Sequence, residues 1–316
     1  MNIISMRDIF FDSLYEEARK NKDIIVISAD MGAPALDKFR RDFKSRFINV
    51  GIAEENMVTI AAGLALAGKK VFIYAIMPFV TSRCYEMIKV DLSLMNLPVT
   101  VVGVGAGFSY DDSGPTHHST DDIAIMRTLP NMTVLSPSDI FSTARFARAV
   151  CGMAGPSYVR LDREVLPVIY KKDDDFSSGL SSLKTGGDLI IIATGNMVHI
   201  ALEAARKLAR EHSLICGVID LYRVKPINSE LLLKNIKGVK RVVTLEEHLI
   251  SGGLGSAIAE TLADNGSKAA LKRLAVPDKY YYAYGGRKNI QALCRLDAKG
   301  VTNEILDWLK IRKRKI

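Results

Sequence analysis

The segment from Phe47 to Ala67 restricts the possible folds more than any other stretch of this chain. It reads FINVGIAEENMVTIAAGLALA: a short apolar run, a Gly-Ile-Ala turn, two carboxylates and a long helix of small residues. Within the helix, apolar side chains recur at helical spacing (Met57, Ile60 and Leu64), so one face is expected to pack against the rest of the protein. A strand followed by a turn and a buried helix is typical of parallel α/β sheets.

Two neighbouring carboxylates, Glu54 and Glu55, lie in the first turn of this predicted helix. That turn follows the carboxyl end of a strand, which is where α/β proteins place their ligands. A carboxylate in the same position also stabilises a helix simply by complementing its dipole. The spacing alone supports a functional role and a structural role equally well.

Strands alternate with helices along the chain, which predicts mainly parallel sheets covered by helices on both faces. At 316 residues the chain is long enough for two domains, each with its own core. The segment 171–187 (KKDDDFSSGLSSLKTGG) has the composition of a linker. We therefore predict two doubly wound α/β domains, a first over residues 1–170 and a smaller one over residues 188–316.

The composition of the chain argues against a membrane, a nucleic acid or a metal ion bound by cysteines as its partner. Apolar runs are too short for a signal peptide or a membrane span, so we predict a cytoplasmic protein without membrane contact. The net charge is +8, partly from the tail Lys310–Lys315, but basic residues are not interleaved with aromatic ones, so no nucleic-acid partner is expected. The four cysteines form no CxxC pair, which favours reduced, mostly buried thiols over a metal site.

Candidate ligand contacts follow two other predicted strands. Asp30 comes just after the apolar run 24–28, where a ligand contact and a simple turn or helix cap are equally expected. Phe79 and Arg83 lie four residues apart at the start of a helix predicted for residues 80–95, so they share one face. An aromatic ring beside an arginine suits a flat heteroaromatic ligand, although Phe79 alone is more typical of a core.

A polar loop, Gly105–Thr120 (GAGFSYDDSGPTHHST), contains two of the five histidines, His117 and His118. A histidine in such a loop can titrate near neutral pH, as general acid–base catalysis requires. Adjacent histidines do not easily face one metal ion, and no second group of ligands accompanies them, so we predict no metal site in this chain. The alternative is a pair of solvated loop histidines.

Five longer motifs follow one another along the chain. They are MRDIFFDSLYE with ISAD, NVGIAEENMVTIAAGLALAG, PFVTSRCYEMIKVDLSLMNLPV, SGPTHHSTDDIAIMRTLPNMTVLSPSD and VVTLEEHLISGGLGSAIAE. Together they resemble the C-terminal part of transketolase-like, thiamine-diphosphate-dependent enzymes. The resemblance covers nearly the whole chain and implies a pyrimidine-binding domain followed by a transketolase C-terminal domain.

The family's motif for magnesium and diphosphate, Gly-Asp-Gly followed some thirty residues later by an asparagine, is not found in this sequence. The resemblance therefore implies the small subunit of a split transketolase, in which Mg²⁺ is held mainly by a separately encoded large subunit. Because the family builds its active site between domains of different protomers, we expect an α2β2 heterotetramer. Its expected reaction transfers a two-carbon ketol unit between sugar or sugar-phosphate substrates with thiamine diphosphate as cofactor.

The resemblance also implies roles for single residues at the cofactor. Glu54 matches the glutamate that hydrogen-bonds the aminopyrimidine ring of thiamine diphosphate. Phe79 would stack on that ring, with Ser82 or Arg83 beside it. Asp30 matches an aspartate near the thiazolium ring.

At the substrate, His117 matches a histidine that hydrogen-bonds substrate oxygens and assists proton transfer, and Arg163 matches an arginine that binds the sugar-phosphate end. Three positions depart from the family pattern. Ser113 stands where the family usually has an aspartate that contacts a sugar hydroxyl. His118 stands where glutamine is common, and Gly105 stands where a family histidine contacts phosphate. These departures motivate the hypothesis of an unusual acceptor, such as a modified or nucleotide-linked sugar.

Two alternatives stay open at this stage. One is the β subunit of a 2-oxo acid dehydrogenase or a deoxyxylulose-phosphate-synthase-like enzyme, which shares the cofactor but starts from a 2-oxo acid. The GPTHH loop and the compact length favour a transketolase over it. The other is a non-catalytic scaffold, which has no need for Glu54 or His117.

Overall fold

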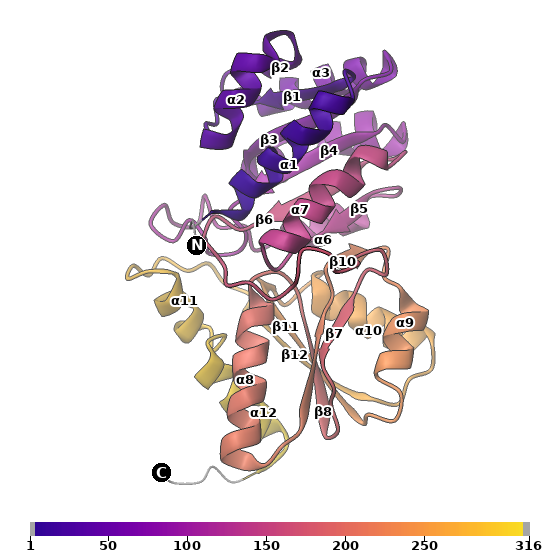
Figure 1. Cartoon of the computed structure of the whole chain (residues 1–316). Helices are drawn as coiled ribbons and strands as arrows, with labels where there is room; N and C mark the ends of the chain where they lie inside the picture. Colours follow the sequence, from indigo (N-terminus) through magenta and orange to yellow (C-terminus); the bar gives the residue numbers. More distant parts are fainter. Residues whose placement is uncertain (1–3, 312–316) are drawn as a thin grey trace.

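The computed structural model describes residues 4–311 and shows two α/β domains, one above the other in Figure 1. A seven-stranded sheet has the order β10-β5-β6-β4-β3-β1-β2, and a five-stranded sheet has the order β12-β11-β8-β9-β7. Neighbouring strands run parallel except at two edges, where β10 pairs with β5 and β7 pairs with β9 in antiparallel fashion. The predicted class, two doubly wound domains with mainly parallel sheets, is confirmed. Most of the basic tail, residues 312–316, lies outside the described residues.

The first domain contains most of the seven-stranded sheet. Its strands are β1 (Ile24–Ser28), β2 (Phe47–Asn49), β3 (Lys70–Ile76), β4 (Val99–Val104), β5 (Thr133–Leu135) and β6 (Ser157–Leu161). Its helical segments are α1 (Met6–Lys20), α2 (Pro34–Asp42), η1 (Lys44–Arg46), α3 (Glu54–Leu66), α4 (Met77–Val80), α5 (Tyr85–Met87), η2 (Ile88–Leu94), α6 (Asp122–Thr128), α7 (Ile140–Ala149) and η3 (Val150–Gly152).

The second domain contains the five-stranded sheet, and its strand β10 pairs with the seven-stranded sheet of the first domain. Its strands are β7 (Ser181–Lys184), β8 (Leu189–Ala193), β9 (Cys216–Asp220), β10 (Arg223–Lys225), β11 (Arg241–Leu249) and β12 (Ala270–Val276). Its helices are α8 (Met197–His212), α9 (Ser229–Asn235), α10 (Leu254–Asp264), α11 (Arg287–Leu293) and α12 (Ala298–Trp308).

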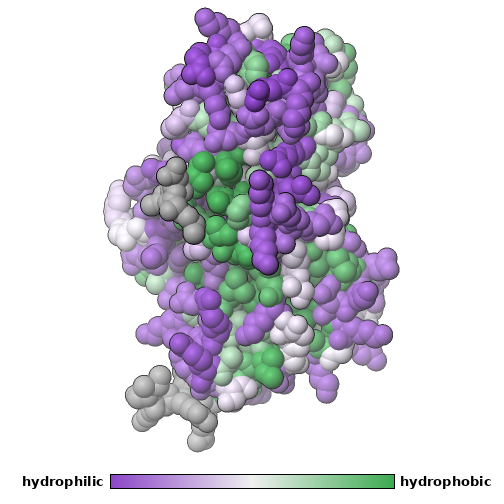
Figure 2. Space-filling view, in the orientation of Figure 1, coloured by the Kyte–Doolittle hydropathy of each residue, from purple (hydrophilic) through white to green (hydrophobic). Residues whose placement is uncertain are grey.

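Helices cover both faces of each sheet, as the apolar strands require. On the first sheet, α1, α2 and α7 bury an aromatic-rich cluster, while α3 and η2 bury small and aliphatic side chains on the other face. The cluster under α3 continues into the second domain, where it includes Ile190 of β8 and Ile258 of α10. One core cluster is therefore shared by the two domains, while each domain has a further cluster of its own on the opposite face of its sheet, under α1, α2 and α7 in the first and under α8 and α12 in the second. Figure 2 shows hydrophobic residues gathered in the middle of the molecule, where the domains meet.

The predicted helix over residues 80–95 is wrong, because the structure breaks it into α4, α5 and the π-helical segment η2. The break lies at residues 81–84. There the Arg83 amide donates to the carbonyl of Pro78, five residues back, and the Cys84 thiol donates to the carbonyl of Phe79. These bonds replace the regular helical ladder.

The segment expected as a linker, residues 171–187, also has structure of its own. Strand β7 lies within it, and Phe176 is buried against Tyr222 and Phe146. The polar composition of β7 reflects its place at a sheet edge, where one side faces water.

Two further findings bear on the sequence-based expectations. The four cysteines are free, with Cys84, Cys216 and Cys294 buried and Cys151 half-buried, so their burial agrees with the prediction of mostly buried side chains. Within residues 4–311 no helix combines the length and apolarity that a membrane crossing needs.

Candidate active site

The predicted site residues lie along one edge of the seven-stranded sheet. Strand β1 ends just before Asp30, β3 just before α4 with Phe79, β4 before the loop 105–120, and β6 just before Arg163. These strands run parallel to their neighbours in the sheet, so their carboxyl ends meet at the same edge. This edge is the usual ligand position in an open α/β sheet.

Glu54 is the buried carboxylate of the site. It begins α3 and is 4% exposed, whereas its neighbour Glu55 faces solvent. Its Oε2 atom accepts a hydrogen bond of 2.8 Å from Nη1 of Arg83, and the Arg83 guanidinium lies 4.3 Å from the centre of the Phe79 ring. The structure thus distinguishes two carboxylates that helical spacing alone left equivalent: Glu54, which the family resemblance had indicated, is the one that bonds Arg83.

His117 completes this group from the loop after β4. Its ring meets the Phe79 ring edge to face, with 5.1 Å between centroids. A turn fixes its backbone, because the His117 amide donates to the carbonyl of Gly114 at 2.9 Å. The Nδ1 atom lies 3.0 Å from the hydroxyl of Thr116. The contacts therefore run from Glu54 through Arg83 and Phe79 to His117.

Tyr110 is a member of the site that the sequence did not reveal. Its ring lies 6.1 Å from that of His117 and 4.6 Å from the guanidinium of Arg163. Gly105 makes this placement possible: its φ is +106°, and a Cβ atom at this position would overlap the Tyr110 ring. Arg163 also forms an ion pair of 3.5 Å with Asp112. The glycine that departs from the family pattern therefore makes room for a tyrosine.

Three predicted residues take other partners near this group. The Asp30 amide donates to the side chain of Asn49 at 3.0 Å. Ser82 donates to Asp121 at 3.5 Å, and burial raises the pKa of that carboxyl group. Ser113 is exposed and donates to Asp112.

His118 points to a different ring from its neighbour. It is buried, 5.0 Å from the ring of Phe108, and burial lowers its pKa. Its Nε2 atom has no hydrogen-bond partner among residues 4–311. The interpretation of two solvated loop histidines therefore does not hold for His118.

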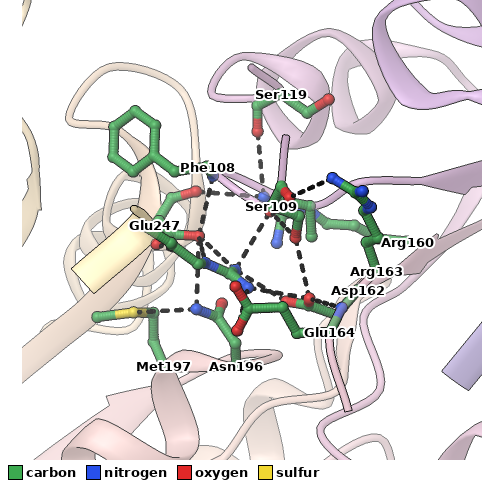
Figure 3. Close-up of polar contacts among 12 residues, drawn as sticks. Phe108, Ser109, Ser119, Arg160, Asp162, Arg163, Glu164, Asn196, Met197 and Glu247 are labelled. Atoms are coloured by element: carbon green, nitrogen blue, oxygen red, sulfur yellow. Dashed lines mark hydrogen bonds and ion pairs between the residues drawn. The ribbon is translucent and has the colours of Figure 1, made fainter. Parts of the chain in front are cut away.

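A buried ionic network joins the two domains beside Phe108 and Ser109 of the loop 105–120 (Figure 3). Arg287 of α11 donates to both carboxylate oxygens of Asp162, at 2.9 and 2.8 Å, and to Glu247 of β11 at 2.6 Å. Burial alone would raise the pKa of Asp162, but the charge and hydrogen bonds of Arg287 hold it below its usual value. Sequence patterns did not reveal this network, since its members are far apart in the chain.

The donor set at the sheet edge fits an aminopyrimidine ring. Glu54 offers a buried carboxylate oxygen to a ring nitrogen, and the half-buried Phe79 offers an aromatic face next to it. No three acidic, histidine or cysteine side chains among residues 4–311 come together as a metal site. A cavity of about 390 Å³ lies elsewhere, beside α7, and none of the predicted site residues lines it.

Comparisons with known proteins identify the family. The model "Transketolase, pyrimidine binding domain" matches residues 2–168, and "Transketolase, C-terminal domain" matches residues 180–301. One subunit of the apulose-4-phosphate transketolase of Phocaeicola vulgatus is 36% identical over 98% of this chain and 99% of its own length. A 6-deoxy-6-sulfo-D-fructose transketolase subunit of a Clostridium species is 37% identical over 86% of this chain and 85% of its own length.

A solved structure and a second group of relatives complete the comparison. The structure, described as a split gene transketolase in an inactive beta4 tetramer, has a TM-score of 0.88 and 33% identity over 98% of this chain and all of its own. A 1-deoxy-D-xylulose-5-phosphate synthase of Geobacter sulfurreducens is 36% identical over 94% of this chain, but only 47% of that protein is covered. The chain therefore belongs to the transketolase family and is similar over its whole length to single subunits of split members.

Proposed function

We propose that this chain is the small subunit of a two-subunit transketolase that transfers a two-carbon ketol unit between sugar or sugar-phosphate substrates. One observation carries the proposal: Glu54, Arg83, Phe79 and His117 contact one another in series, and this group would suit the pyrimidine half of a thiamine diphosphate site. The other half, for the diphosphate and Mg²⁺, would come from a large subunit. Relatives that are named as subunits and match this chain over most of their length support this division.

In this proposal each residue of the group has a distinct role. When bound, thiamine diphosphate supplies the electron sink for a carbanion. Glu54 would hold a proton on the pyrimidine ring nitrogen, and Arg83 fixes the position of the Glu54 carboxylate through their 2.8 Å ion pair. Phe79 supports the ring from one side, with Ser82 and Asp30 in flanking positions. His117 moves a proton to or from a substrate oxygen.

The substrate side is formed by Arg163, Tyr110 and the exposed Ser113. The side chain of Arg163 is 45% exposed, so its guanidinium is available to an anionic group of the substrate. Tyr110 narrows the space beside Gly105. Two relatives are named for ketoses, apulose-4-phosphate and 6-deoxy-6-sulfo-D-fructose, which supports a substrate other than an ordinary pentose phosphate here. Because a ketose is the donor of the ketol unit, these names bear on the donor, and the unusual acceptor remains a hypothesis motivated by Ser113 and Gly105. The buried His118 would support the loop and not bind substrate directly.

The proposed assembly is an α2β2 heterotetramer in the cytoplasm, with Mg²⁺ bound mainly by the large subunit. The similar split gene transketolase, described as an inactive beta4 tetramer, supports the need for a partner. The free thiols of this chain are compatible with a reducing compartment.

A panel of substrates tests the proposed reaction against its alternative. The small and large subunits are co-expressed, and ketose phosphates and 2-oxo acids are offered as donors to a set of aldoses. Ketol transfer without release of carbon dioxide supports the proposal. Release of carbon dioxide from a 2-oxo acid would favour a deoxyxylulose-phosphate-synthase-like reaction, although this chain covers only 47% of such a relative. No turnover of any donor by a complex that binds the cofactor would favour a scaffold.

A further inference from the structure

The buried network between the domains is centred on one guanidinium group. Arg287 lies at the start of α11 and is 5% exposed, and its two carboxylate partners, Asp162 and Glu247, are 2% and 1% exposed. Its Nη2 atom also donates to the backbone carbonyl of Ala106 at 3.2 Å. Asp162 belongs to the first domain, and Glu247 belongs to the second. One arginine thus bonds both domains and the loop between β4 and His117.

The same network holds the beginning of that loop by three bonds. The Phe108 amide donates to Oε2 of Glu247 at 3.1 Å, and the Ser109 hydroxyl donates to Oδ1 of Asp162 at 2.9 Å. Arg287 supplies the third bond, to Ala106. Between them, Gly107 has a φ of +58°, and any Cβ atom there would overlap the Glu247 carboxylate. The loop backbone therefore lies directly against the network.

Two residues held by the network, Ser109 and Asp162, each precede a residue of the substrate side of the site. Tyr110 follows Ser109, and Arg163 follows Asp162. The two side chains stack on each other, with 4.6 Å between the guanidinium and the ring centre. The Arg163 guanidinium also approaches the carbonyl of Ser109 at 3.5 Å. Any shift of Ser109 relative to Asp162 would thus separate this pair.

We propose that Arg287 is a positioning residue of the substrate site: from the C-terminal domain it fixes Ser109 and Asp162, and thereby the Tyr110–Arg163 pair. The proposal rests on the function given above and assigns a role in it to the second domain. The guanidinium keeps its charge because its pKa is raised well above its usual value by Asp162 and Glu247, against the effect of burial.

A role in positioning explains this network better than a role in stability. Buried ion pairs add little net stability, since desolvation offsets most of their attraction, and apolar side chains of similar size often serve as well. A guanidinium between two carboxylates does fix distances and angles, because its donors form a rigid planar fork. Glu247 is itself oriented by Gln291, which donates to Oε1 at 2.7 Å.

The test compares Arg287→Met and Arg287→Lys with a control that removes another buried bond between the domains. Tyr170→Phe serves as that control, because the Tyr170 hydroxyl donates to the buried Asp220 at 2.9 Å. Hydrogen exchange of residues 105–120 is measured on the purified chain. The KM for a ketopentose phosphate and the Kd for thiamine diphosphate with Mg²⁺ are measured on the assembled enzyme.

We expect Arg287→Met to speed exchange of the loop amides at least about tenfold and to raise KM by about tenfold or more, with kcat and the cofactor Kd within about twofold. Arg287→Lys should show smaller increases in loop exchange and in KM than Arg287→Met. Tyr170→Phe should change neither the exchange rate nor KM. Ser109→Ala gives a milder variant in case Arg287→Met does not fold: it removes the hydroxyl that donates to Asp162 and to the carbonyl of Ala106 but leaves the ionic network intact. It should shift KM in the same direction.

Equal exchange rates and equal KM values for Arg287→Met and Tyr170→Phe would overturn the proposal. So would an Arg287→Met variant that loses kcat and cofactor affinity while keeping KM. A wild-type complex without ketol transfer would contradict the proposed function instead, and the exchange comparison would still show whether Arg287 holds the loop.

Discussion

Replacing Glu54 with glutamine separates the catalytic role proposed for this carboxylate from its role in stability. The structural loss is small: the ion pair joins Glu54 to an arginine side chain that is 40% exposed, so it contributes about 0.5–1 kcal/mol. The helix dipole of α3 adds about 0.3–1 kcal/mol. Together these reduce the free energy of unfolding by about 1–2 kcal/mol, which lowers Tm by only a few degrees in a protein of this size.

The functional loss should be much larger. A glutamine cannot supply the negative charge that Glu54 presents to the pyrimidine ring in a buried position, and losing one such preorganised contact lowers kcat about 100-fold or more. That factor corresponds to about 2.7 kcal/mol of transition-state stabilisation. Activity should therefore fall far more than stability.

The measurement is kcat at saturating thiamine diphosphate and Mg²⁺, together with Tm, for the assembled enzyme. Glu55→Gln is the matched control, since Glu55 lies in the same first turn of α3, complements the same dipole and faces solvent. It should reproduce part of the change in Tm with nearly unchanged kcat. If Glu54→Gln and Glu55→Gln had similar kcat values, the reasoning would be refuted.

Three further predictions concern the loop and the core. Gly105→Ala should lower the free energy of unfolding by about 1–3 kcal/mol and raise KM, because the methyl group displaces Tyr110. Gly238→Ala, also at a positive φ but with open space around it and outside the site, should leave KM unchanged in the same kinetic assay. His117→Asn should lower kcat about 100-fold while calorimetry shows an unchanged Kd for the cofactor. Burial raises the pKa of Asp220 to about 7, so the folded protein keeps a proton that the unfolded chain releases above its ordinary pKa near 4. Wild-type stability should thus fall by about 1.4 kcal/mol per pH unit between pH 5 and 7 from this group, and urea unfolding should show that Asp220→Asn removes the slope; parallel slopes for both proteins would contradict this.

Local patterns predicted the part of the site that depends on sheet topology. Helical spacing after Glu54 and apolar strands before Phe79, His117 and Arg163 were enough to bring these residues to one sheet edge. Periodicity alone could not distinguish Glu54 from Glu55, because both lie in the same turn. The family resemblance indicated Glu54, and in the structure its burial and its hydrogen bond to Arg83 separate it from the exposed Glu55.

Features that depend on distant contacts were missed. Arg287 bonds Asp162, 125 residues earlier, and its seven-residue helix α11 has no pattern that singles it out. Strand β10 has only three residues and joins the sheet of the other domain. It is too short for an alternating apolar and polar pattern to predict it. The break at residues 81–84 arises from side-chain and backbone bonds to α4 within a sequence that remains compatible with a helix.

In the proposed assembly this chain holds only the pyrimidine half of the cofactor site. Calorimetry with thiamine diphosphate and Mg²⁺ tests it most directly, for this chain alone and for its mixture with the large subunit. We predict tight binding in the mixture and none by the chain alone. Tight binding by the chain alone would contradict the claim, because it would require a complete diphosphate and metal site within these 316 residues.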